Sequence, residues 1–199
     1  MNDTKEHILK VSLGLFLQKS FKEVTMKELV EKTGMSKGAF YHYFESKEQL
    51  FLEVVNNTLS AAEVDYSKFN KDSLYQFYHE YLAFLHNVTD SLFQTIDKND
   101  TSLGMNYFSL VFDAIKLFPS FKEQMLKSHQ VELGALTEIV HNARSSGEIN
   151  SFMNDEQIAS IFIFSNDGLG LRNIMNGRTE DIGNSLAALW DSFYKGLKA

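Results

Sequence analysis

The chain of 199 residues contains no cysteine and a single proline, Pro119. Without cysteine it can form neither disulfides nor thiolate metal sites, and it has no cysteine nucleophile. The near absence of proline accompanies long stretches of helical periodicity and almost no alternating apolar pattern. Together these features predict an all-α protein.

Long uncharged apolar runs are also missing, since none reaches the roughly 20 residues that a membrane helix needs. The amino terminus, MNDTKEHILKVSLGLF, lacks the basic start, apolar core and small-residue cleavage site of a secretory signal. We therefore expect a cytoplasmic protein with no membrane partner. A hydrophobic content of 44% is enough for a substantial core.

Basic residues are fewer than acidic ones, 19 against 26, so the formal net charge is −7. This balance argues against a protein that binds polyanions without specificity. The charge is unevenly distributed, however: residues 1–50 hold eight lysines against seven acidic residues, whereas residues 51–199 carry a net charge of −8. If any part of the chain binds nucleic acid, it is the first fifty residues.

The sequence contains no recognisable catalytic or metal-binding pattern. His79 and His86 are seven residues apart, which corresponds to about 10.5 Å along a helix and is too far for one metal ion. There is no zinc or di-iron spacing, no phosphate-binding glycine loop and no nucleophilic serine arrangement. We expect no metal, no cofactor and no enzymatic activity.

Short helices with defined ends fill the amino-terminal region after a first helix at 4–20. Thr25 and Glu28 form the pattern of a capping box that begins a second helix, and Gly34 is placed to end it in a left-handed conformation. Ser36 can cap a third helix at 37–44. Two helices joined by a short turn with a glycine predict a helix-turn-helix at residues 25–44.

The third helix separates into two faces at about 100° per residue. Phe40 and Phe44 point together towards a core. The rest of the helix presents small residues between hydrogen-bonding side chains and a cation: Lys37, Gly38, Ala39, Tyr41, His42 and Tyr43. Such a surface suits close contact with DNA, although Gly38 could also be a near-cap glycine and the tyrosines ordinary half-buried packing residues.

A fourth helix is predicted at 47–66, with Ser46 and Gln49 as a second capping box. Lys47 lies in its first turn, where free amides and a cation together favour a phosphate group. The alternative is a solvated lysine beside Glu48.

The stretch TGMSKGAFYHYFESKEQLF, within residues 8–52, resembles the DNA-binding domain of the TetR family of transcriptional regulators. The resemblance implies a recognition helix that enters the major groove of double-stranded DNA. The DNA-binding residues are then Thr25, Ser36, Lys37, Gly38, Ala39, Tyr41, His42, Tyr43 and Lys47. Two positions depart from the family: Ser20 stands where glycine usually ends the first helix, and Tyr43 where histidine is common.

The remainder of the chain is also expected to be helical, with helices at 72–88, 90–98, 103–118, 120–146, 155–175 and 181–197. Ser120 with Glu123 makes a capping box after Pro119. We expect a DNA-binding domain at 1–48 and a larger ligand-binding and dimerisation domain at 49–199. A weaker resemblance to the TetR family continues in this larger domain, in the segments RSSGEINSFMNDEQIA and ALWDSFYKGL.

The helix at 155–175 is apolar on nearly every side and must be buried on both sides. The last helix has apolar residues at near-heptad spacing. These patterns predict a homodimer joined by a four-helix bundle, with the interface residues Ile161, Leu186, Leu189, Trp190 and Phe193. The alternative is that both helices serve a core within one chain.

Thirteen of the seventeen phenylalanines follow residue 50. A mostly apolar pocket between helices can hold a small ligand, and the resemblance implies an unidentified small-molecule effector. The candidate ligand-binding residues are Tyr78, Phe108, Phe112 and Asn166. Aromatic stripes are more often core, and Asn166 with Asp167 could equally be a satisfied polar pair.

Taken together, these features favour a ligand-responsive repressor that binds a palindromic operator as a dimer. The competing hypothesis is a helical carrier or adaptor that keeps the fold without binding an operator.

Overall fold

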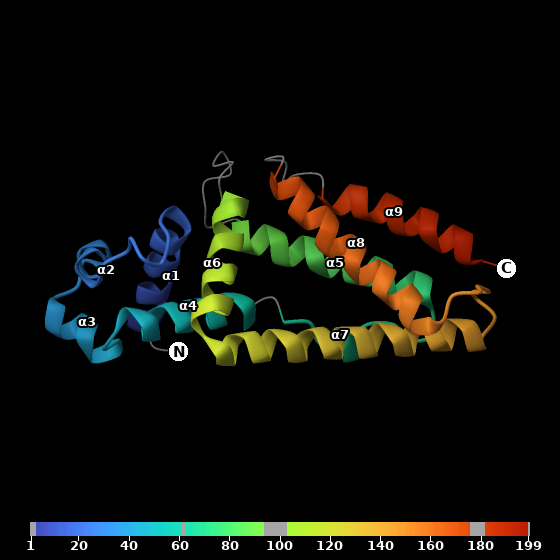
Figure 1. Cartoon of the computed structure of the whole chain (residues 1–199), viewed down its shortest axis with the longest axis horizontal. Helices are drawn as coiled ribbons and strands as arrows, with labels where there is room; N and C mark the ends of the chain where they lie inside the picture. Colours follow the sequence, from blue (N-terminus) through green and yellow to red (C-terminus); the bar gives the residue numbers. More distant parts are fainter. Residues whose placement is uncertain (1–2, 61–62, 94–102, 176–181, 199) are drawn as a thin grey trace. The chain divides into compact units, whose positions relative to one another are not determined.

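The computed structural model describes residues 3–60, 63–93, 103–175 and 182–198, and within them it is helical without strands (Figure 1). The elements are α1 (Asp3–Gln18), α2 (Met26–Thr33), α3 (Lys37–Tyr43), α4 (Lys47–Ser60), the 3₁₀ helix η1 (Tyr66–Lys68), α5 (Leu74–Phe93), α6 (Leu103–Leu117), α7 (Pro119–Ser145), α8 (Asp155–Met175) and α9 (Ile182–Leu197). The all-α prediction is confirmed.

The helices form two compact units that do not follow the predicted boundary after residue 48. The first unit contains Met1–Glu63 and Ile96–Gln124, and the second contains Val64–Thr95 and Met125–Ala199. The difference arises because α4 and α6 both pack on α1. Two segments distant in sequence thus complete the amino-terminal unit.

An aromatic core joins α1 and α4 in the first unit. The Phe51 ring meets the Phe16 ring edge-on at 4.9 Å and lies 4.8 Å from the Phe21 ring. All three side chains are buried. Asp113, on α6, accepts a hydrogen bond from the backbone amide of Phe21 at 3.4 Å. The segment between α1 and α2 is therefore tied to α6 as well as to the core.

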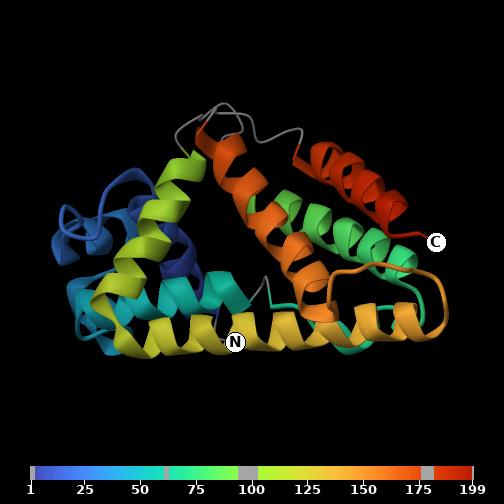
Figure 2. The ribbon, with the colours of Figure 1, turned by 45° about the vertical axis from the view of Figure 1, so that its right-hand side comes forward.

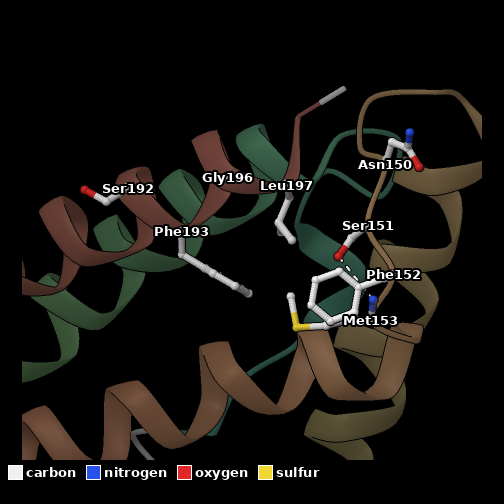
Figure 3. A pocket seen from close by; sticks show the side chains of 8 residues that line it. All are labelled: Asn150, Ser151, Phe152, Met153, Ser192, Phe193, Gly196 and Leu197. Carbon is white, nitrogen blue, oxygen red and sulfur yellow. Dashed lines mark hydrogen bonds between the residues drawn. The ribbon is translucent and has the colours of Figure 1, made fainter.

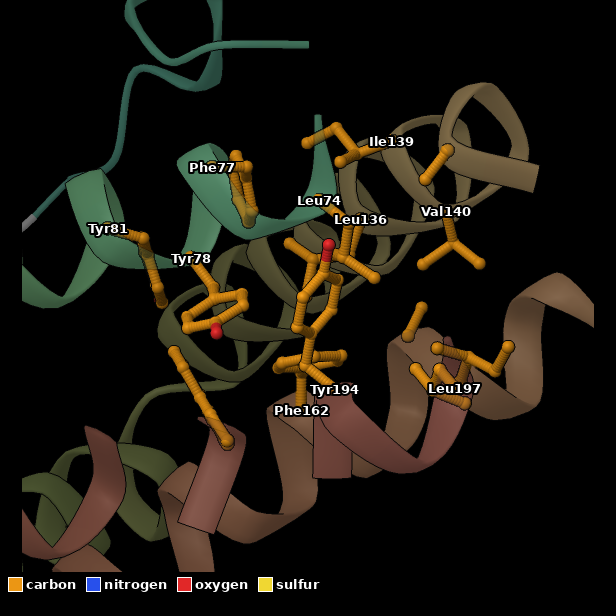
Figure 4. Close-up of a cluster of buried hydrophobic side chains, with 14 of the residues drawn as sticks. Leu74, Phe77, Tyr78, Tyr81, Leu136, Ile139, Val140, Phe162, Tyr194 and Leu197 are labelled. Atoms are coloured by element: carbon orange, nitrogen blue, oxygen red, sulfur yellow. The ribbon is translucent and has the colours of Figure 1, made fainter. Parts of the chain in front are cut away.

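The second unit has its own core, formed mainly by α5, α7, α8 and α9 (Figure 4). Figures 1 and 2 show α8 and α9 side by side. Tyr78 and Trp190 are among its largest fully buried side chains. The Trp190 indole donates to Ser165 Oγ at 2.9 Å, so the polar edge of that ring is satisfied inside the unit.

Helix boundaries differ from the predicted ones at several places. The helix expected at 47–66 is observed as α4 only to Ser60, and residues 63–65 are not helical. Helix α5 continues to Phe93, whereas separate helices were expected at 72–88 and 90–98; residues 94–98 lie outside the described residues. Helix α7 begins at Pro119 rather than at a Ser120 cap. Proline is well suited to this first position, because its missing N–H would have no helical partner there.

Among the helices that the structure describes, none is both long and apolar enough to cross a membrane.

Candidate nucleic-acid interface

The turn between α2 and α3 is built from short-range hydrogen bonds. Thr25 Oγ1 accepts from the Glu28 amide at 3.2 Å and caps α2. Gly34 ends α2 with φ 69°, a left-handed conformation that favours glycine. Ser36 Oγ then accepts from the Ala39 amide at 3.3 Å and caps α3. These bonds fix where both helices begin and how the chain turns between them.

The predicted capping boxes are only half formed. The Glu28 carboxylate does not turn back to its own cap but accepts from Lys19 Nζ at 2.6 Å. Ser46 Oγ accepts from the Gln49 amide at 3.1 Å, while the Gln49 side chain accepts from the Glu45 amide, one residue before the expected donor. Each hydroxyl still caps its helix, so the helix starts are retained.

Helix α3 buries one face and exposes the other. Phe40 and Phe44 are 0% exposed, and their ring centroids lie 6.4 Å apart. Tyr41 and His42 are exposed, and Tyr43 is half-buried. Lys37, Gly38 and Ala39 are exposed as well. The structure thus brings together the surface that the angular positions predict for these residues.

The polar groups on this surface are close enough to influence one another. Lys37 Nζ lies 5.8 Å from the centre of the Tyr41 ring, within the range of a cation–π contact. The rings of His42 and Tyr43 meet at 5.5 Å, nearly perpendicular. The exposed face of α3 therefore offers a cation, an imidazole and phenol hydroxyls on one short helix.

Lys47 is oriented differently from the simple phosphate contact that the sequence suggests. Its ammonium donates to the carbonyl oxygens of Phe21 and Val24, both at 2.7 Å, and lies 4.4 Å from the centre of the Phe21 ring. Two of its three donors are therefore used within the unit. Lys47 holds the segment between α1 and α2 against the start of α4, a role that the sequence analysis missed.

At Ser20 the chain turns after α1 without a residue in the left-handed conformation. Its backbone amide and hydroxyl both donate to Glu23 Oε2, at 2.9 and 2.7 Å. Among the described residues, only Gly34 and Gly147 have positive φ. Because Ser20 keeps an ordinary backbone conformation, the absence of the family's glycine leaves the turn intact. These bonds also lower the pKa of Glu23.

Comparison with known proteins agrees with this geometry. The sequence profile described as "Bacterial regulatory proteins, tetR family" matches residues 8–54, the segment that contains both helices and their caps. This part of the chain is similar to the DNA-binding domain of the TetR family. The uncharacterised HTH-type transcriptional regulator YerO of Bacillus subtilis is 50% identical over 52 residues. That match covers 26% of this chain and only 18% of YerO.

Two further proteins resemble this chain over most of its length. The uncharacterised HTH-type transcriptional regulator YfiR of Bacillus subtilis is 25% identical over 174 residues, which cover 83% of this chain and 81% of YfiR. The crystal structure of reduced Escherichia coli NemR superposes with a TM-score of 0.61 at 22% identity, covering 96% of this chain and 97% of that one. The second unit therefore shares the family fold.

The residues predicted for a dimer interface divide between the two faces of α8 and α9. Leu186 and Trp190 are 1% and 2% exposed and belong to the core of the second unit, so their prediction was wrong. Near-heptad spacing does not distinguish the inner face of a helix from the outer one. Ile161 and Leu189 are exposed, whereas Phe193 is half-buried against Phe162 at 5.3 Å.

The predicted ligand-binding residues are not brought together within either unit. Phe108 and Phe112, with ring centroids 6.0 Å apart, belong to the first unit. Tyr78 and Asn166 belong to the second. Tyr78 is completely buried and donates to Asp191 Oδ1 at 2.7 Å. Burial and this carboxylate raise the pKa of Tyr78, as expected for a core tyrosine.

A polar cluster in the second unit was missed by the sequence analysis. Tyr81 donates to Glu132 Oε1 at 3.2 Å, and His129 Nδ1 lies 3.8 Å from the other carboxylate oxygen. The Tyr66 ring is stacked on Tyr81 at 6.2 Å. Burial raises the pKa of Glu132, and the negative charge of Asp167 raises it further. Within the described residues, no group of three acidic or histidine side chains is placed to hold a metal ion.

Glu148 is a second half-buried carboxylate that the sequence did not identify. It accepts hydrogen bonds from the amides of Leu74 and Tyr75 and from the hydroxyls of Ser73 and Tyr194, at 2.8–3.0 Å. Burial opposes its charge, but these four donors outweigh burial and lower the pKa of Glu148. The carboxylate caps α5 and joins it to α9.

Proposed function

We propose that this protein is a TetR-family transcriptional regulator that binds double-stranded DNA as a homodimer and is released from its operator by a small-molecule effector. The observation that carries the proposal is the exposed face of α3. Lys37, Gly38, Tyr41 and His42 are free on one side of a helix whose Phe40 and Phe44 are fully buried. A short, rigidly seated helix with this surface fits the major groove.

Different groups would serve the phosphates and the bases. Thr25 and Ser36, which cap α2 and α3, and Tyr43, the last residue of α3, would offer hydroxyl groups for the sugar–phosphate backbone. Tyr41 and His42 would reach base edges, and Lys37 would contact a phosphate. Lys47 would act mainly by holding the segment after α1, with only its third N–H left for a phosphate.

We propose that dimerisation occurs through the exposed faces of α8 and α9. At about 100° per residue, the outer face of α8 carries Ile161, Phe164, Gly168, Leu171 and Met175, all on one side of the helix. The apolar members of this group other than glycine are exposed. The face of α9 that contains Leu189 is exposed as well. A two-fold axis would pair these faces with their copies in a four-helix bundle.

The dimer is tested by placing a charge on this face. We expect Leu189→Glu to convert the protein to monomers in sedimentation equilibrium, because the carboxylate would be buried without a partner. Leu126→Glu, which places the same charge at an exposed leucine of α7, serves as the control. A Leu189→Glu protein that sediments as the wild type does would refute this interface.

The effector would bind in the second unit, where Glu132 and the tyrosines supply hydrogen-bonding groups inside an apolar body. It can act only by binding more tightly to the arrangement of the dimer that does not fit two half-sites. Glu132→Gln should therefore change the effector concentration needed for release while leaving operator affinity without effector unchanged.

Operator binding is tested by fluorescence anisotropy on duplexes recovered by selection from a random pool. We expect affinity to fall steeply with salt, and Lys37→Ala to reduce the salt slope by about one phosphate contact per recognition helix. Lys127→Ala removes an exposed lysine of α7 and is the control. No selective duplex binding at any salt concentration would favour a carrier or adaptor instead.

A further inference from the structure

The segment between α7 and α8 holds a phenylalanine completely in water. Phe152 is 100% exposed. Leaving such a side chain unburied forgoes about 1.5–3 kcal/mol of hydrophobic stabilisation. Single exposed aromatic residues are common on protein surfaces. Phe152 differs because hydrogen bonds hold the backbone on both sides of it.

Arg144 holds the backbone that flanks Phe152. Its guanidinium donates to the carbonyl oxygens of Ser151 and Met153 at 2.8 and 2.6 Å, and to Asp155 Oδ1 at 2.7 Å. The same ion pair lowers the pKa of Asp155. One side chain therefore binds the carbonyl groups of the residues immediately before and after Phe152.

A further backbone hydrogen bond fixes this segment to α9: the amide of Asn150 donates to the carbonyl oxygen of Leu197 at 2.7 Å. Phe152 is thus displayed from a backbone that is already ordered. A partner that covers the ring would have little backbone entropy to remove on binding.

Beside Phe152 lies a hollow of about 450 Å³ (Figure 3). Figure 3 shows Phe193 and Leu197 reaching into it from α9, with Met153 opposite. Its complete lining is Asn150, Ser151, Phe152, Met153, Ser192, Phe193, Gly196 and Leu197. None of these residues is charged, which is the composition of a buried interface core rather than of ordinary surface.

The hollow continues the outer face of α9. At about 100° per residue, Ser192, Phe193 and Gly196 lie within 60° of Leu189, the exposed leucine at the proposed dimer interface. Two of these residues are small, so the helix surface recedes beside Phe152. An apolar projection and an uncharged recess therefore adjoin each other at one end of the same face.

We propose that Phe152 is an interface anchor that inserts into this hollow on a second copy of the chain. The inference rests on the proposed dimer. In a two-fold interface every contact is made twice, so each chain would supply one projecting ring and one recess. Buried aromatic anchors of this kind carry a large share of interface energy.

The contact is tested by cross-linking, since the natural chain has no cysteine to interfere. Phe152→Cys and Ser192→Cys chains, distinguished by size tags, are co-expressed and treated with a short bismaleimide. We expect a covalent heterodimer. Phe152→Cys paired with Glu138→Cys, on the exposed surface of α7, is the control. Equal yields from both pairs, or none from the first, would overturn the proposal.

The contribution of Phe152 to dimer affinity is tested by sedimentation equilibrium. Phe152→Ser should raise the dimer Kd about ten-fold or more, and because the ring is fully exposed within one chain, the thermal stability measured below that Kd should not change. A dimer Kd equal to that of the wild type overturns the anchor. If Leu189→Glu nevertheless yields monomers, the dimer itself stands and only the anchor has failed; if that variant stays dimeric, both have failed.

Discussion

Replacing Gly38 by alanine separates what the fold requires from what DNA requires. Gly38 is exposed in the first turn of α3, and a Cβ built on it meets nothing within 4 Å. Its φ is not in the left-handed region. No contact or backbone conformation within the chain therefore demands glycine at this position.

The change should stabilise the folded protein and weaken its complex with DNA. Alanine in place of glycine in a helix contributes roughly 0.5–1 kcal/mol to the free energy of unfolding, which urea denaturation measures. On DNA, the new methyl group would separate α3 from the groove at both half-sites. We expect an operator affinity about ten-fold lower, equivalent to about 1.4 kcal/mol, by fluorescence anisotropy at fixed salt.

Gly134→Ala is the matched control, because Gly134 is also an exposed helical glycine with no atom within 4 Å of a built Cβ. It lies on α7 and should gain stability without any change in DNA affinity. Wild-type operator affinity in Gly38→Ala would refute the close approach of α3 to DNA. A loss of stability in that variant would refute the argument that the fold does not need the glycine.

Other predictions concern single side chains. Lys47→Met should lower the free energy of unfolding by about 2–3 kcal/mol, because the Phe21 and Val24 carbonyls lose a charged donor; unchanged urea stability would contradict this role. Tyr41→Ala should alter the preference among selected operators rather than the salt slope, and identical preferences would remove Tyr41 from base recognition. Glu148→Gln should weaken the fold near neutral pH by about 1–3 kcal/mol and flatten its loss of stability in acid. The lowered pKa of Glu148 makes its contribution present above the ordinary carboxyl range and lost as the pH falls through the folded pKa. Glu138→Gln, which removes an exposed carboxylate 3.5 Å from Lys71 Nζ, should not flatten it.

The exposed face of α3 could be predicted because it depends on neighbours in sequence. Thr25, Gly34 and Ser36 set the helix ends through contacts with residues at most three positions away. The helical period then assigned Phe40 and Phe44 to the core. Pattern and spacing were sufficient because the large apolar side chains of so short a helix lie on one side, and burial of that side is favourable whichever segment covers it.

Side chains that act across the chain could not be assigned in this way. The sequence predicts that Lys47 is a phosphate ligand. In the structure it instead donates to carbonyl oxygens 23 and 26 residues earlier in the chain. Glu148 caps a helix that begins 74 residues before it. Neither spacing produces a local pattern. Tertiary packing brings Lys47 to the segment after α1, and it brings Glu148 to the start of α5 and to α9.

The sequence by itself determined an all-α chain, the helix-turn-helix and the face of α3 that is exposed. It also predicted that α8 is covered on both sides. Only the tertiary structure decided which residues lie on which side: Leu186 and Trp190 are core, while Ile161, Leu189 and Phe152 face outwards. The physical reason is that an apolar residue has the same helical position whether its own chain or another one covers it, so the distinction depends on long-range packing.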